Sequence, residues 1–241
     1  MGNAVLVYPA IIKGLQGYDL VIADGRATIG NYLDALEKFL VTVPLDKQRN
    51  PGGNCQGCDL CCAERIPLTS IDYFHLAKYL TGDDARAFFD RFTWVAVDGR
   101  VVDISLRRDE AGRCCFLDPQ KKTCRVYQVR PFVCRTFTCA AATQRALRLR
   151  SIITNIGEDE LVRIWLALCD QGGRLLIHEA RRPSVKRGDW GPTPFSGHTS
   201  YADIRLKSIC PPDLWRSLWR SPRKQGGRKY GKSAGQSHYI G

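Results

Sequence analysis

The sequence lacks several features that would quickly assign it to a large class of proteins. No apolar run approaches the roughly 18 residues of a membrane-spanning helix, and the longest candidate, residues 4–12, is interrupted by Pro9. No basic residue precedes that run, so we expect neither a secretory signal nor a membrane protein. The G-x-G-x-x-G and P-loop patterns are missing, and no Ser/His/Asp order or pair of carboxylates stands out. We therefore expect a cytoplasmic protein, and the sequence leaves open whether it is an enzyme.

Acidic residues are absent from the C-terminal end. The chain as a whole holds 36 Lys and Arg against 24 Asp and Glu, a net charge of +12, but residues 214–241 contain no acid. Residues 221–241 are rich in Gly, Ser, Gln and Lys, with little that a core would bury, so we predict a basic, disordered tail. Such a tail could associate weakly with nucleic acid or another polyanion, and no other partner is indicated.

Cysteine is sparse over most of the chain and dense in one part of it. Nine of the eleven cysteines lie between Cys55 and Cys139. Cytoplasmic thiols stay reduced, so clustered cysteines there more often hold metal than form disulfides. The first group is the run Cys55-x2-Cys58-x2-Cys61-Cys62. Two intervening residues let a tight turn point successive sulfurs at one centre, so this spacing indicates a metal site.

The second group of cysteines is more widely spaced. It reads Cys115-x8-Cys124-x9-Cys134-x4-Cys139, and Cys114 stands directly before it. If residues 114 and 115 are extended, their side chains point to opposite sides, so only one of the two should bind metal. Outside this region, Cys169 falls on the apolar face of an expected helix and Cys210 precedes two prolines, so we interpret both as thiols without a metal role.

Four motifs in this region resemble the YkgJ-like cysteine-cluster proteins, a family that includes flagellin lysine N-methylases. The motifs are Cys-x2-Cys-x2-Cys-Cys, Cys-Phe-Leu-Asp, Cys-x-Val-Tyr and Arg-Pro-x2-Cys-Arg-x-Phe-x-Cys, and they cover residues 55–139. The resemblance implies a bacterial or archaeal protein with a zinc- or iron-chelating domain, and it selects Cys115 over Cys114. The metal ligands that it implies are Cys55, Cys58, Cys61, Cys62, Cys115, Cys124, Cys134 and Cys139.

The type of ligand does not identify the metal, because zinc and iron–sulfur clusters both accept four thiolates. Zinc fits if Cys55 and Cys58 pair with two later cysteines. The repeated x2 spacing favours an iron–sulfur cluster, of the 4Fe–4S type, with a fourth ligand from farther away. Eight ligands allow one or two centres. Arg130 and Arg135 either offset the negative charge of the thiolates or face solvent.

The periodicity of apolar residues predicts an α+β fold: a small, loop-rich core held together by metal, with flanking amphipathic helices and a β-hairpin. Helices are expected over residues 28–43, 69–80, 83–92 and 212–219, and another begins at the acidic run 158–160. A hairpin is expected over residues 94–104. We predict four parts: an N-terminal α/β extension (1–48), the cysteine-cluster domain (49–142), a mainly helical part packed on the core (143–220) and the basic tail (221–241).

The sequence leaves three functions open. The first is a cysteine-ligated metal-binding protein of the YkgJ-like type, with no assigned reaction. The second is a lysine N-methylase-like enzyme that uses an iron–sulfur centre and S-adenosylmethionine. The third is a nucleic-acid-associated adaptor that acts through the basic tail.

Overall fold

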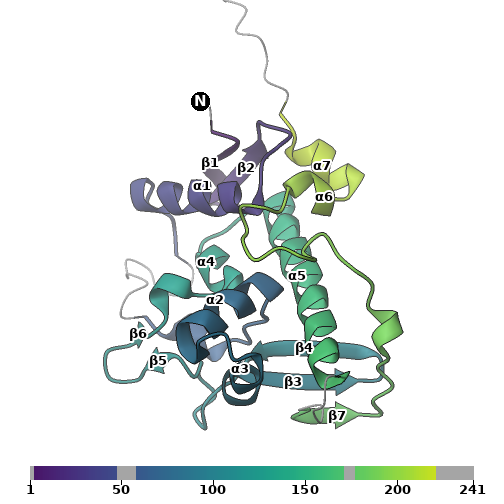
Figure 1. Ribbon diagram of the computed structural model, residues 1–241. Helices are drawn as coiled ribbons and strands as arrows, with labels where there is room; N and C mark the ends of the chain where they lie inside the picture. The colour runs from purple at the N-terminus through teal and green to yellow at the C-terminus, as the bar shows by residue number, and fades with distance from the viewer. Residues whose placement is uncertain (1–2, 48–57, 171–176, 221–241) are drawn as a thin grey trace, which may run out of the picture.

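The computed structural model describes residues 3–47, 58–170 and 177–220, which form an α+β arrangement (Figure 1). The predicted fold class is therefore confirmed, while the predicted basic tail lies outside the described residues. In chain order, the elements are β1 (Val5–Ile12), β2 (Leu15–Ile22), α1 (Ile29–Thr42), the 3-10 helix η1 (Leu60–Ala63), α2 (Ser70–Thr81), α3 (Ala85–Phe92), β3 (Thr93–Asp98), β4 (Val101–Leu106), β5 (Leu117–Asp118), β6 (Thr123–Cys124), η2 (Tyr127–Val129), α4 (Phe132–Thr136), α5 (Gln144–Asp170), β7 (Glu179–Arg181), η3 (Arg187–Asp189), α6 (Leu206–Ile209) and α7 (Pro212–Leu218).

The first two strands form an antiparallel hairpin. Lys13 and Gly14 make its turn, and both have positive φ, 51° and 82°, as two-residue hairpin turns require. The same hairpin also contacts the segment that precedes α5, because the backbone N–H of Tyr18 donates a hydrogen bond of 3.0 Å to the carbonyl of Ala141. This hydrogen bond holds the end of the cysteine-rich region against β2.

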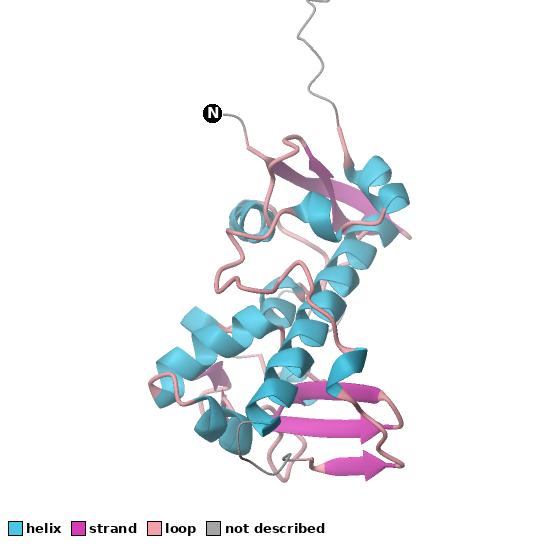
Figure 2. Ribbon diagram, turned by 45° about the vertical axis from the view of Figure 1, so that its right-hand side comes forward, coloured by secondary structure: helices cyan, strands magenta, loops and turns pink. Residues whose placement is uncertain are grey.

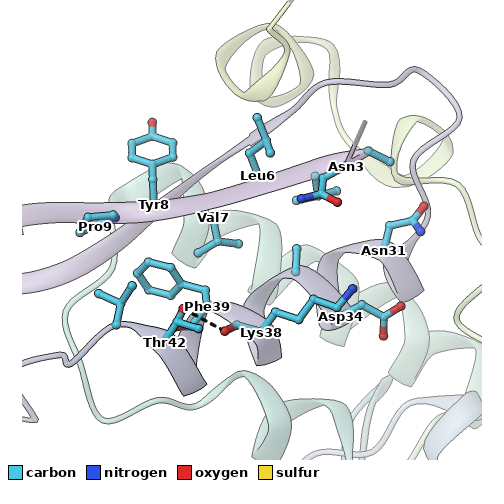
Figure 3. Close-up of a pocket in the computed structure, with 14 residues that line it drawn as sticks. Asn3, Leu6, Val7, Tyr8, Pro9, Asn31, Asp34, Lys38, Phe39 and Thr42 are labelled. Carbon is cyan, nitrogen blue, oxygen red and sulfur yellow. Dashed lines mark hydrogen bonds between the residues drawn. The ribbon is translucent and has the colours of Figure 1, made fainter. Parts of the chain in front are cut away.

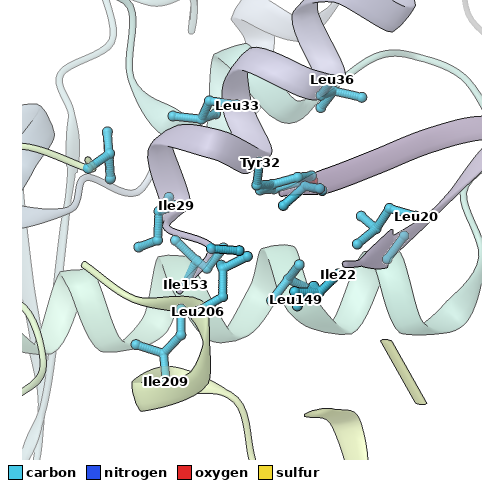
Figure 4. Packing of buried hydrophobic residues seen from close by; sticks show 14 of the residues in the cluster. Leu20, Ile22, Ile29, Tyr32, Leu33, Leu36, Leu149, Ile153, Leu206 and Ile209 are labelled. Carbon is cyan, nitrogen blue, oxygen red and sulfur yellow. The ribbon is translucent and has the colours of Figure 1, made fainter. Parts of the chain in front are cut away.

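Helix α1 begins after Thr28, which forms a reciprocal capping box with Asn31. The predicted helix over residues 28–43 is thus confirmed. Its buried face belongs to a first hydrophobic cluster, which lies between α1, β2, α5 and the C-terminal helices (Figure 4). Members of this first cluster include Val5, Leu20, Ile22, Ile29, Tyr32, Leu36, Leu149, Ile153, Leu206 and Leu218.

Helix α5 is longer than the sequence pattern predicts. It begins at Gln144, so the acidic run at residues 158–160 lies in its middle and does not open it. Two of these acids have specific partners: Glu158 accepts a hydrogen bond of 3.0 Å from the backbone N–H of Ile104, and Glu160 accepts one of 2.6 Å from the hydroxyl of Ser196. The prediction of the helix start was wrong because these acids serve tertiary contacts that local sequence does not show.

The second sheet has the strand order β4-β3-β7 (Figure 2). The hairpin predicted around Asp98-Gly99 is confirmed by β3 and β4, and Gly99 takes the positive φ of 59° that its turn needs. Strand β7 is parallel to β3 and pairs Ala96 with Glu179. Because β7 has only three residues, the sequence carries no periodic signal for it.

A second hydrophobic cluster lies at the other end of α5, over the β4-β3-β7 sheet (Figures 1 and 2). It includes Leu161 and Trp165 of α5 together with Leu76 of α2 and Phe88 of α3. Helix α5 therefore contributes to both clusters and connects them. No helix in the described part of the chain is long and apolar enough to cross a bilayer.

Candidate metal centre

A cavity of about 580 Å³ gathers most of the predicted ligands. Its walls come from α1, η1, the β5–β6 ladder, η2 and α4. The cysteines that line it are Cys58, Cys61, Cys62, Cys114, Cys124 and Cys134. Five of these six were predicted as metal ligands, and Cys114 was not. We call this space the cysteine cavity.

The remaining predicted ligands stand apart from this set. Cys55 lies outside the described residues. Cys115 and Cys139 are described residues, but neither is among those that line the cysteine cavity. Two further cysteines pack elsewhere, Cys169 against the second hydrophobic cluster and Cys210 against the first.

The turn that carries the first cysteine group is held by Asp59. Its carbonyl accepts a hydrogen bond of 3.0 Å from the backbone N–H of Cys62, which closes the η1 turn. Its carboxylate forms an ion pair with Arg113 and lies 4.0 Å from the ammonium group of Lys122. One acidic side chain thus ties the first cysteine group to the segment that leads to Cys114.

Cys114, and not Cys115, lies on the cavity wall. Its side chain is buried, with the residue 5% exposed, and its backbone N–H donates a hydrogen bond of 2.7 Å to the carbonyl of Cys62. Cys115 instead pairs its backbone with arginines on either side: its N–H donates to the carbonyl of Arg107 at 3.0 Å, and its carbonyl accepts from Arg125 at 2.7 Å. Residues 115 and 116 form a turn, closed by a hydrogen bond of 2.9 Å from the Leu117 N–H to the Cys114 carbonyl. The thiols of Cys114 and Cys115 are hydrogen-bonded to each other, which lowers the pKa of Cys115.

Local sequence does not decide between these two cysteines. Because residues 115 and 116 form a turn, the alternation of an extended segment does not apply to them. Phe116 also lines the cysteine cavity and is 4% exposed. The resemblance to a motif implied Cys115, whereas Cys114 is the one of the two that lines the cavity.

The last two cavity cysteines are placed by short local structures. Cys124 lies in β6, which pairs with β5 through a two-residue antiparallel ladder. Cys134 lies in the middle of α4, between Arg130 and Arg135 of the same segment. Both arginines line the cavity, so they can offset the charge of thiolates there. The guanidinium of Arg130 lies 4.1 Å from the centre of the Tyr127 ring, which fixes its position at the wall.

The thiols in the cavity are electrostatic neighbours. Burial raises the pKa of Cys134 well above its usual range, and the charges of Cys114, Cys61 and Cys124 raise it further. Burial also raises the pKa of Cys124. Several thiolates in this space would therefore repel one another unless a positive centre were bound among them. That is the electrostatic condition under which a metal ion has a high affinity for thiolates.

The donor set fits a metal that prefers sulfur. Within the described residues, no three His, Cys, Asp or Glu side chains are already grouped as they would be around a bound ion. Six thiols nevertheless line one cavity, together with Arg130, Arg135 and Lys122, and soft thiolates select zinc, copper(I) and iron–sulfur clusters. Ligands on loops and short helices can close around a metal when it binds.

A second cavity, of about 450 Å³, offers no comparable donor set. It lies between β1 and α1 and is lined by residues from Asn3 to Val43 (Figure 3). Asp34 and Lys38 are its charged residues, and none of its lining residues is cysteine or histidine. The cysteine cavity is therefore the stronger candidate for metal binding among the described residues.

Comparison with protein-family models gives a match over part of the chain. Residues 54–153 match the CxxCxxCC family. Its description is "Putative zinc- or iron-chelating domain". The CxxCxxCC match includes all six cysteines that line the cavity and extends into the first part of α5.

A curated relative has no more specific description. The "Uncharacterized protein MJ0661" of Methanocaldococcus jannaschii is 31% identical to this chain over 84 residues. The similarity covers 34% of this chain and 42% of that protein, which is less than half of either length. No solved structure matches this chain.

Proposed function

We propose that this chain is a metal-binding protein whose cysteine cavity holds an iron–sulfur cluster or zinc through thiolates. The observation that carries the proposal is that six cysteines from separate segments of the CxxCxxCC match line one cavity. The proposed ligands come from Cys58, Cys61, Cys62, Cys114, Cys124 and Cys134. Cys55, Cys115 and Cys139 remain ligand predictions from the sequence alone.

We favour an iron–sulfur cluster over zinc. A zinc site with four thiolates closes around a single ion, with zinc–sulfur distances of about 2.3 Å. The cavity has a volume of about 580 Å³ and more than four thiols, so it has room for a cluster of several iron and sulfide atoms. The x2 spacings from Cys55 to Cys61 also suit a cluster. Such a cluster would supply one-electron redox chemistry at this site.

The residues around the thiols would stabilise that centre in two ways. Arg130, Arg135 and Lys122 line the cavity, and their positive charge offsets the net negative charge of a thiolate-ligated centre. Leu33 and Leu40 of α1 line the cavity as well and reduce the access of water. Lower solvent access and hydrogen bonds to sulfur are the means by which a protein tunes the reduction potential of a cluster.

The two alternative functions gain no specific observation from the described part of the chain. The lysine N-methylase-like hypothesis needs a site for S-adenosylmethionine, and the nucleic-acid hypothesis depends on residues 221–241, which lie outside the described residues.

The decisive experiment is anaerobic purification followed by a visible absorption spectrum, with iron, zinc and acid-labile sulfide quantified per chain. We expect a brown protein with matched amounts of iron and sulfide. A colourless protein that holds zinc would show that the site binds structural zinc and no cluster. A protein that holds neither metal in stoichiometric amount, even after anaerobic reconstitution, would refute the proposal.

Single substitutions link the metal to the cavity. Cys58→Ser should lose most of the metal, because it removes a thiolate that faces the cavity. The matched control is Cys210→Ser, since Cys210 packs against the first hydrophobic cluster and does not line the cavity. Equal metal loss in both variants would show that the cavity does not hold the metal.

A further inference from the structure

Helix α4 is too short to be stable alone, yet it carries a cysteine of the cavity. It has five residues, Phe132–Thr136, with Cys134 at its centre. Isolated helices shorter than about 12 residues are marginal in water. Pro131, at the N-cap position, makes no side-chain capping hydrogen bond. The position of Cys134 therefore depends on contacts that other elements make with α4.

One buried carboxylate supplies the missing cap. The Oδ1 atom of Asp72, in the first turn of α2, accepts a hydrogen bond of 2.8 Å from the backbone N–H of Phe132. Asp72 is 2% exposed, so water does not compete for this bond. A charged acceptor forms a hydrogen bond roughly twice as strong as a neutral one does. Asp72 thus holds the first N–H of the helix that presents Cys134.

Asp72 is itself fixed by the cap of its own helix and by one other segment. The backbone N–H of Thr69 donates to its Oδ2 at 3.0 Å, which completes the capping box of α2. The hydroxyl of Tyr201 donates to its Oδ1 at 2.7 Å and lies 2.6 Å from the hydroxyl oxygen of Thr69. The ring of Tyr201 also packs against Phe132, with ring centres 5.7 Å apart. Three segments therefore meet at one carboxylate, which leaves little freedom for the start of α4.

We propose that Asp72 is a positioning residue of the metal centre: by capping α4 it sets where the Cys134 sulfur enters the cavity. This inference rests on the proposed function. Residues that orient metal ligands without touching the metal typically change metal affinity by about 10- to 100-fold when they are mutated. Asp72 acts in this way through the backbone of α4, two residues before the ligand.

The test uses Asp72→Asn in the full chain, reconstituted with Co²⁺ as a spectroscopic probe. An amide keeps the size of the side chain, but its single oxygen is a neutral acceptor and its nitrogen accepts no hydrogen bond. The hydrogen bond that caps α4 at Phe132 is therefore weakened even where the oxygen stays at the Oδ1 position. We expect Co²⁺ to dissociate to a chelator about 10- to 100-fold faster than from the wild type. We also expect the thiolate-to-cobalt absorption bands to change, because the geometry at Cys134 changes.

The matched control is Glu160→Gln. Glu160 is 1% exposed and accepts hydrogen bonds from Arg163, Thr193 and Ser196, all in α5 or residues 193–196. The Glu160→Gln variant should have a lower melting temperature, as Asp72→Asn should. Its cobalt spectrum and cobalt dissociation rate should stay at their wild-type values. If Asp72→Asn also leaves both at wild-type values, the inference is wrong.

A second variant covers the case in which Asp72→Asn does not fold. Tyr201→Phe removes the hydrogen bond to Oδ1 and the one shared with the Thr69 hydroxyl, and it keeps the ring against Phe132. It should accelerate cobalt release in the same direction, by a smaller factor, and wild-type release would overturn the inference. The proposed function fails separately: in that case the wild type itself binds Co²⁺ without thiolate-to-cobalt bands.

Discussion

The carbonyl oxygen of Cys62 accepts a hydrogen bond of 2.7 Å from the backbone N–H of Cys114. This bond joins the two cysteine groups through their main chains, so the groups are held side by side by the polypeptide itself. The side chains of both residues line the cysteine cavity. The main chain therefore brings thiols of both cysteine groups to one cavity.

The first prediction separates the adjacent cysteines. Cys114→Ser should lose more than half of the bound metal, because it removes a thiol from the cavity wall. Cys115→Ser should keep the wild-type amount. Metal per chain, measured after anaerobic gel filtration, checks both. If Cys114→Ser kept its metal and Cys115→Ser lost it, Cys115 would be the ligand, as the motif resemblance implies.

The second prediction concerns a glycine in the middle of α5. A Cβ atom at Gly157 would lie 2.6 Å from the Cβ of Thr69, the residue that caps α2. Gly157→Ala should therefore destabilise the protein by about 1–3 kcal/mol, although alanine favours a helix by about 1 kcal/mol. Urea unfolding measures the change. Gly191→Ala is the control, since a Cβ there meets nothing within 4 Å, and equal stabilities would contradict the close approach.

The third prediction is a pH dependence of stability. Burial raises the pKa of Glu158 from 4.5 to about 7. The folded state therefore binds more protons than the unfolded state between these pH values, and stability falls as the pH rises through this window. The shift corresponds to about 3 kcal/mol. Between pH 4.5 and about 8, the free energy of unfolding should fall by about 3 kcal/mol more in the wild type than in Glu158→Gln.

The measurement is the free energy of unfolding of both proteins at both pH values, in the same metal state. The change with pH in the variant is then subtracted from the change in the wild type. Comparing the two proteins removes the pH dependence of metal binding, because the thiols are unchanged. Parallel pH profiles for the wild type and Glu158→Gln would contradict the prediction.

The fourth prediction concerns the reactivity of thiols. Bound metal should protect Cys58, Cys61 and Cys62, the cavity cysteines of the first group, from iodoacetamide, and chelation should expose them to it, because the reagent attacks thiolates. Cys169 and Cys210 provide internal references: burial raises the pKa of Cys169 to about 11 and that of Cys210 to about 12, so both should react slowly in either state. Peptide mass spectrometry measures the labelling of each cysteine. Equal labelling of Cys58, Cys61 and Cys62 with and without metal would contradict the prediction.

Local sequence signals predicted the elements whose causes are local. The helix after Thr28 has its capping residue and its apolar spacing within one segment, and the hairpin at Gly99 has its turn residues in place. The start of α5 was missed because Glu158 and Glu160 bind partners that are distant in sequence. Strand β7 was missed for the same reason, since its pairing partner is β3.

For the candidate site, too, the local part of the pattern was visible in the sequence and the tertiary part was not. Spacing identified the cysteines, but it did not show which of them share a cavity. Which of Cys114 and Cys115 lines the cavity depends on the turn at residues 115–116 and on the hydrogen bond from the Cys114 N–H to the Cys62 carbonyl, a contact that is distant in sequence. The role of Asp72 depends on a contact with Phe132 that no local pattern encodes.

The sharing of α5 between two hydrophobic clusters has a consequence for the order of events during synthesis. The first cluster contains both Val5 and Leu218, so it cannot close until almost the whole described chain has left the ribosome. The residues that line the cysteine cavity lie between Leu33 and Thr138, and all of them emerge earlier. The thiols of the cavity have therefore all left the ribosome while the N-terminal hairpin still lacks its C-terminal partners.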